Sequence, residues 1–194
     1  MKKLDAISKT SFKEGAYHFY QDFIVKTVFN DVQREEYKNA SDAYDHCFFL
    51  AKENKSEAAK KAYTVCCALK KKLDPFVAQW IAALYEPRLS YYHYKTQDYQ
   101  MAISVTGEII LANRILQEQG YQYLFFSEMQ QVHNLSRIYF KLGQTSHAIS
   151  ICIKSLINMY ECSDRWTLGR MIGGIPEGDI IADSQYAMIV QIMT

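Results

Sequence analysis

The sequence predicts an all-α protein built from stacked pairs of antiparallel helices. Apolar residues recur with helical periodicity from about residue 13 onward, and no segment shows the sustained apolar/polar alternation of a strand bounded by hairpin turns. The 194 residues include only 3 Pro and 8 Gly, so long elements with few loops are expected. Hydrophobic residues make up 49% of the sequence, which is enough for the core of one domain, or one and a half.

The N-terminal region is predicted to contain two helices. The first covers about residues 12–29, where the apolar positions are too dense for a single stripe and indicate packing on two sides. The second covers about residues 40–53, and either Asn39 or Ser41 can cap its first turn. The second helix is expected to pair with the helix that follows it.

Proline positions define the next two predicted helices. A third helix covers about residues 56–73 with Ser56 as its N-cap, and it ends because Pro75 disfavours a helical conformation at Asp74. Asp74 and Pro75 then open a fourth helix, in whose first turn the missing N–H of proline costs nothing. Pro87 lies near the middle of this helix and should kink it or break it in two.

Glycines close the later helices. One helix is predicted over about residues 98–119 and ends at Gly120, and the next over about residues 121–142 ends at Gly143. A further helix follows over about residues 145–160. Beyond it the composition changes to a Gly-rich connector at 161–178 and then to a strongly apolar tail at 179–194, which we expect to be a helix that caps the last pair.

Two helix pairs repeat at an offset of 46 residues. The offset aligns Leu89-Ser90 with Leu135-Ser136, Lys95 with Lys141, and Ala102-Ile103-Ser104 with Ala148-Ile149-Ser150. The predicted pairs therefore cover about 40–73, 75–119 and 121–160, preceded by the helix at 12–29.

The second copy resembles the tetratricopeptide repeat. The family pattern consists, in order, of a large residue, Leu-Gly, Tyr, a turn glycine and a close-packed Ala. The corresponding residues in this sequence are Val132, Leu135-Ser136, Tyr139, Gly143 and Ala148. The first copy has Gln97 in place of the turn glycine, Cys152 stands where a large aromatic is usual, and Tyr160 stands where proline is usual. The resemblance implies a right-handed superhelix of antiparallel helix pairs over 40–160, with helices longer than the family standard. It also implies a non-enzymatic module that binds a protein or peptide on its concave face.

One candidate binding surface follows from the repeat. Arg88, Tyr91 and Lys95 are spaced i, i+3, i+7 on one helix face, and the offset places Asn134, Arg137 and Lys141 in the same relation. We expect the two faces to lie side by side and form a groove of cations, an amide and an aromatic residue. Such a groove suits the carboxylates of an acidic segment or of a polypeptide C-terminus.

Net charge and cysteine content argue against several other classes of function. The formal net charge is only +1, no secretory segment is visible, and no apolar stretch approaches a membrane span, so we expect a cytoplasmic protein without nucleic-acid or membrane partners. The five cysteines, with no C-x-x-C spacing, indicate reduced thiols, and neither a metal site nor a cofactor site is expected. Two alternatives stay open: a homo-oligomeric scaffold such as a homodimer, and an all-α enzyme whose site assembles from distant helices.

Overall fold

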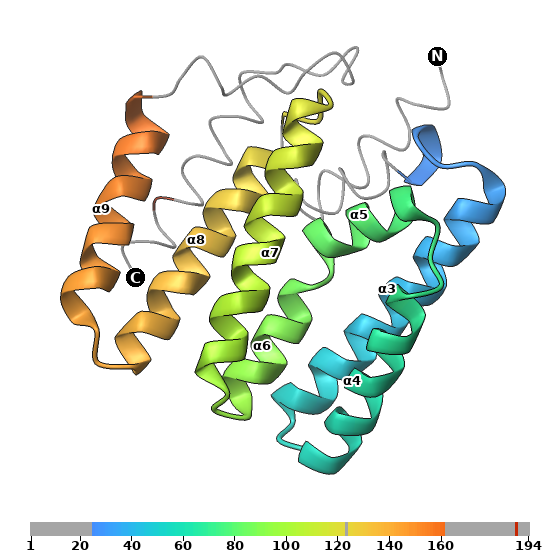
Figure 1. The fold of residues 1–194 in the computed structure, drawn as a ribbon, viewed down its shortest axis with the longest axis horizontal. Helices are drawn as coiled ribbons and strands as arrows, with labels where there is room; N and C mark the ends of the chain where they lie inside the picture. Colours follow the sequence, from blue (N-terminus) through green and yellow to red (C-terminus); the bar gives the residue numbers. More distant parts are fainter. Residues whose placement is uncertain (1–24, 123, 162–188, 190–194) are drawn as a thin grey trace.

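The computed structural model of the protein describes residues 25–122, 124–161 and 189 (Figure 1). This part of the sequence is all-helical and contains no strand, which confirms the predicted all-α class. Its helices are α3 (Asp31–Lys52), α4 (Ser56–Lys70), α5 (Pro75–Leu84), α6 (Pro87–Lys95), α7 (Tyr99–Glu118), α8 (Leu124–Lys141) and α9 (Thr145–Glu161). None of the helices in these ranges is both long and apolar enough to cross a membrane. The predicted connector at 161–178 and tail at 179–194 lie almost wholly outside the described residues.

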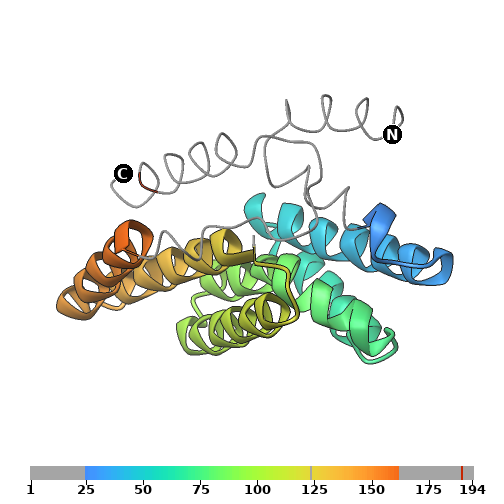
Figure 2. The ribbon, with the colours of Figure 1, turned by 90° about the horizontal axis from the view of Figure 1, so that it is seen from above.

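The helices pack mainly against their neighbours in the sequence. Helix α3 packs on α4, α6 on α7, and α8 on α9, and within each pair the backbone reverses direction at a short turn (Figure 1). Contacts between α3 and α6 and between α7 and α8 join the pairs into one row. Seen from above, α9 lies at one end of this row and α3 and α4 lie toward the other (Figure 2). Helix α9 is therefore the last described helix of the row.

Helix α3 begins nine residues earlier than the predicted start at residue 40. Asn30 and Gln33 form a capping box, in which Gln33 N donates to Asn30 Oδ1 at 2.9 Å and Asn30 N donates to Gln33 Oε1 at 3.2 Å. Asn39 and Ser41 consequently lie inside the helix and do not cap it. Of the predicted helix at 12–29, only residues 25–29 fall within the described part, and residues 25–27 are helical.

The proline predictions are correct, whereas the predicted cap at Ser56 is wrong. Ser56 is the first residue of α4, and the side chain of the preceding Lys55 makes no capping hydrogen bond. Asp74 caps α5 by accepting hydrogen bonds from Phe76 N at 3.0 Å and Val77 N at 3.3 Å. Pro87 separates α5 from α6, so the fourth predicted helix is two helices. Helix α4 ends three residues before its predicted limit, and α8 begins three residues after its predicted start.

Aromatic rings hold α5 in the largest core cluster. Trp80 is fully buried, and its ring meets Phe29 at 6.2 Å and Tyr121 at 4.7 Å, both in edge-to-face geometry. These contacts tie α5 to the residues just before α3 and just after α7. A second cluster of Phe125, Met129 and Met159 lies between α8 and α9. Both clusters fix the helices that carry the candidate site.

Equivalent positions of the two repeat copies have similar environments. Gln97 has a φ of +63° and Gly143 a φ of +71°, so both turns use a left-handed residue, which is uncommon for glutamine. Ala102 and Ala148 are both fully buried, where their small side chains allow close helix crossings. Ser90 is buried as well, and its hydroxyl lies 2.7 Å from Thr106 Oγ1 across the α6–α7 contact.

Candidate ligand pocket between α6 and α8

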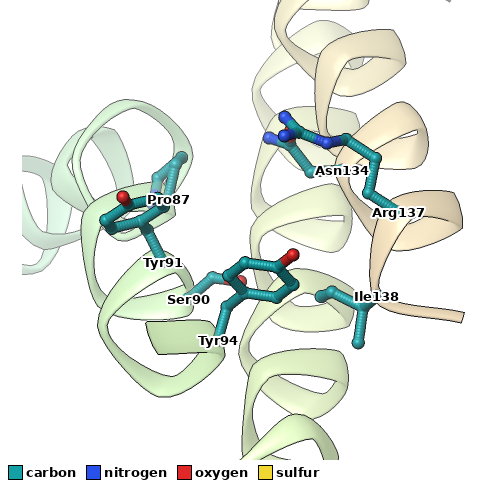
Figure 3. Close-up of a pocket in the computed structure, with 7 residues that line it drawn as sticks. All are labelled: Pro87, Ser90, Tyr91, Tyr94, Asn134, Arg137 and Ile138. Atoms are coloured by element: carbon teal, nitrogen blue, oxygen red, sulfur yellow. The ribbon is translucent and has the colours of Figure 1, made fainter. Parts of the chain in front are cut away.

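A pocket of about 80 Å³ lies between α6 and α8. A space of this size accommodates a few water molecules or one small polar group such as a carboxylate. Figure 3 shows the two sides of the pocket, with side chains from α6 facing side chains from α8. The described residues that line it are Pro87, Ser90, Tyr91 and Tyr94 from α6 and Asn134, Arg137 and Ile138 from α8.

Tyrosine rings form the α6 side of the pocket. Tyr91 and Tyr94 are half-buried, and their ring centroids are 6.4 Å apart. Tyr91 also meets Phe48 of α3 at 4.9 Å, and Tyr94 meets Tyr99 of α7 at 5.8 Å. Rings from three helices therefore form one continuous aromatic row beside the pocket, and packing against neighbours restricts the two tyrosines that line it.

Arg137 provides the positive charge on the α8 side. It is exposed and has no acidic partner among the described residues. The other described arginines each pair with a carboxylate: Arg34 with Asp31 at 2.9 Å, Arg88 with Asp45, and Arg114 with Glu128 at 2.8 Å. The Arg137 guanidinium extends over Asn134 toward the α6 side (Figure 3). Its donors are thus available to an anion in the pocket.

Two neighbours on α8 define the polar environment of Arg137. Asn134 Nδ2 donates to Oε1 of the buried Gln131 at 3.1 Å, which holds the amide at the pocket edge. Burial lowers the pKa of His133 below its usual value of 6.5, and the nearby positive charge of Arg137 lowers it further. His133 is therefore neutral at physiological pH, and the pocket does not gain a second cation from it.

The structure brings together three of the six residues predicted from the repeat. Tyr91, Asn134 and Arg137 line the same pocket, as the prediction of two adjacent faces requires. Arg88 does not line it, because its guanidinium pairs with Asp45 of α3. Arg88 Nη1 also donates to Leu84 O at 3.0 Å, and its Cζ lies 4.2 Å from the centroid of the Tyr85 ring.

Lys95 and Lys141 are also placed away from the pocket. Lys95 lies at the C-terminal end of α6 and lines a separate cavity of about 30 Å³ beside Asn54 and Ser56. Lys141 is the last residue of α8 and is exposed. Both lysines occupy helix ends, one turn beyond Tyr91 and Arg137.

Four residues of the pocket were missing from the predicted set: Pro87, Ser90, Tyr94 and Ile138. Helical spacing could have found all four of them. Tyr94 lies three positions after Tyr91, and Pro87 lies four positions before it. Ser90 lies four positions before Tyr94, and Ile138 lies four positions after Asn134.

The described residues around the pocket do not form a metal site. In the ranges 25–122 and 124–161 no three His, Cys, Asp or Glu side chains are grouped so that they could hold an ion. No family model matches the sequence, and neither a curated protein nor a solved structure matches it significantly. The chemistry of the pocket therefore depends on its own side chains, which offer a guanidinium, an amide, two phenol hydroxyls and apolar rings.

Proposed function

We propose that this protein is a non-enzymatic protein-binding module whose α6–α8 pocket holds a carboxylate of a partner polypeptide. The observation that carries the proposal is Arg137, an exposed guanidinium on the pocket wall with no acidic partner among the described residues. A planar guanidinium binds a carboxylate through two parallel hydrogen bonds, and such charge-assisted bonds are stronger than neutral ones.

The tyrosines on the opposite wall supply the rest of the binding surface. Tyr91 and Tyr94 offer large, ordered apolar area together with hydroxyl groups, a combination that favours protein interfaces. The aromatic row continues from the pocket to Phe48 and to Phe49, whose side chain is exposed. A bound segment can therefore place its carboxylate at Arg137 and lay neighbouring side chains across α6 toward α3.

The scaffold proposed for this function is a right-handed superhelix of helix pairs similar to tetratricopeptide repeats, acting in the cytoplasm. The left-handed turns at Gln97 and Gly143 and the buried alanines at 102 and 148 support it, because each pair of positions is 46 residues apart. In such a stack the first helix of each pair faces a shared concave surface, and α6 and α8 are the first helices of their pairs.

Binding of peptide arrays tests the proposal. Short acidic peptides are presented with a free or an amidated C-terminus, beside matched peptides in which Asn and Gln replace Asp and Glu. The wild-type protein should bind acidic peptides. If amidation alone removes binding, the pocket recognises a peptide terminus, and if neutralising the side chains removes it, the pocket recognises an acidic segment.

Two charge reversals on the same helix provide the matched comparison. Arg137→Glu should weaken peptide binding at least about tenfold, because attraction is replaced by repulsion at the pocket wall. Lys141→Glu makes the same change of charge four residues further along α8, outside the pocket, and should leave affinity close to that of the wild type. Equal losses in the two variants would indicate a diffuse charge effect and contradict the pocket.

A further inference from the structure

The aromatic row beside the pocket ends at an exposed phenylalanine on α3. The ring centroid of Tyr91, on the pocket wall, lies 4.9 Å from that of Phe48, which in turn lies 5.6 Å from that of Phe49. Phe48 and Tyr91 are half-buried where α3 meets α6, whereas Phe49 is 56% exposed. The row therefore connects the pocket to a large apolar side chain that is largely open to solvent.

Helical spacing places Phe49 on the edge of α3 that faces α6. Phe49 lies four residues after Asp45, so the two residues share a side of the helix. Asp45 pairs with Arg88 of α6, which shows that this side of α3 is turned toward α6. Phe49 thus borders the same surface as the pocket and is not on the outer side of the helix row.

Charge distinguishes the two parts of this surface. Near Phe49, the ion pair between Asp45 and Arg88 joins α3 to α6, so these two charges compensate each other. Across the pocket from Tyr91, Arg137 has no acidic partner among residues 25–122 and 124–161 (Figure 3). A ligand that matches the surface therefore has an anionic group for Arg137 and an uncharged, apolar group for the rings.

We propose that Phe49 and the adjoining rings select partner segments with a large apolar side chain about three residues from the carboxylate held by Arg137. This inference rests on the proposed function and specifies its partner. The two ring-to-ring steps from Tyr91 to Phe49 match about three residues of extended polypeptide, which span about 10 to 11 Å. A leucine or phenylalanine at this spacing covers the exposed part of Phe49, and removing both apolar surfaces from water strengthens binding.

A leucine scan of acidic peptides tests this spacing on the whole 194-residue chain. One set of fluorescent Gly/Ser peptides has a single Asp and an amidated C-terminus, and a second set has no Asp and a free C-terminal carboxylate. In each set one Leu is moved from one to five positions away from the carboxylate-bearing residue. Affinity should be highest at about three positions, where it should exceed that of the matched peptide with Ser in place of Leu about tenfold.

Substitutions at two exposed phenylalanines assign this preference to one end of the surface. Phe49→Ser should remove the tenfold gain and leave the affinity for the Leu-free peptide unchanged, whereas Phe49→Leu should keep most of the gain. Phe140→Ser makes the same change at a phenylalanine that is 45% exposed, three residues after Arg137 on α8, and should keep the gain in full. Because both positions are exposed, the variants should fold like the wild type, which far-UV circular dichroism checks.

Several results would overturn the inference. Equal affinities across the leucine scan would show that the rings do not select a partner, while carboxylate binding by Arg137 would stand. A gain that is lost in Phe140→Ser and kept in Phe49→Ser would place the apolar side chain on α8. A dimeric mass by light scattering that becomes monomeric with Phe49→Ser would assign the rings to a second copy of the protein. Absence of binding by every acidic peptide would overturn the proposed function together with this inference.

Discussion

Replacing Arg88 with alanine should destabilise the fold and leave carboxylate binding unchanged. Arg88 joins the first turn of α6 to α3 through Asp45 and also hydrogen-bonds to Leu84 O at the end of α5. Its guanidinium packs over the Tyr85 ring. The side chain therefore supports the junction of three helices and is not a ligand-binding cation.

The size of the effect follows from these contacts. The side chains of Arg88 and Asp45 are 20% and 38% exposed, so solvent screening limits their ion pair to about 1 kcal/mol. The contact with the Tyr85 ring adds about 0.5 to 1 kcal/mol, and the hydrogen bond to Leu84 O adds a similar amount. A total of about 2 kcal/mol should lower the Tm by about 4 to 8 °C in a domain of this size.

Thermal unfolding followed by far-UV circular dichroism measures this loss, and a double-mutant cycle with Asp45→Asn isolates the ion pair. The coupling energy between the two substitutions should be about 1 kcal/mol. Peptide affinity should match that of the wild type. An unchanged Tm together with a loss of peptide binding would mean that Arg88 acts at the pocket and that its pairing with Asp45 is unimportant.

Three further predictions concern the stability of the helix row. Ala148→Trp overfills the buried α8–α9 crossing and should cost at least about 1 to 3 kcal/mol by urea denaturation; a wild-type midpoint would contradict close packing there. Burial lowers the pKa of His93 and His133 below 6.5, so the unfolded protein binds more protons and stability should fall as pH drops from about 7.5 to 5.5. Differential scanning calorimetry of a variant with glutamine at both positions should show a shallower decline. Glu128→Ala removes the acceptor of both Arg114 and Gln117. Because the side chain of Arg114 is 61% exposed, urea denaturation should show a loss of only about 1 to 2 kcal/mol.

Local rules predicted most of the helix boundaries that depend on backbone chemistry. Pro87 removes a backbone donor and clashes with the preceding turn, so the break between α5 and α6 follows from the sequence. Gly120 and Gly143 were predicted as helix ends because glycine readily adopts a positive φ, and both residues have one. The start of α3 was predicted too late because five of the six residues at 31–36 are polar, and apolar periodicity does not reveal a helix that starts with a capping box.

Only part of the site was predicted, because helical spacing shows which residues share a helix face but not which residues of other helices lie next to that face. Tyr91, Asn134 and Arg137 meet in the pocket because α6 and α8 lie side by side. Arg88 shares a face with Tyr91 by spacing, yet an acidic residue on α3 lies within reach and pairs with it. No sequence pattern indicates that Asp45 is placed there, because the contact joins residues of different helix pairs.

Carboxylate binding by Arg137 between α6 and α8 can be observed at the guanidinium itself. The most direct measurement is the NMR signal of the Arg137 side-chain Nε–H group during titration with an acidic peptide selected from the array. We expect a saturable shift of this signal with the same Kd as peptide binding, while the Nε–H signal of Arg88 stays in place because Arg88 Nε already pairs with Asp45. Peptide binding that leaves the Arg137 signal unmoved would show that the carboxylate does not bind at Arg137.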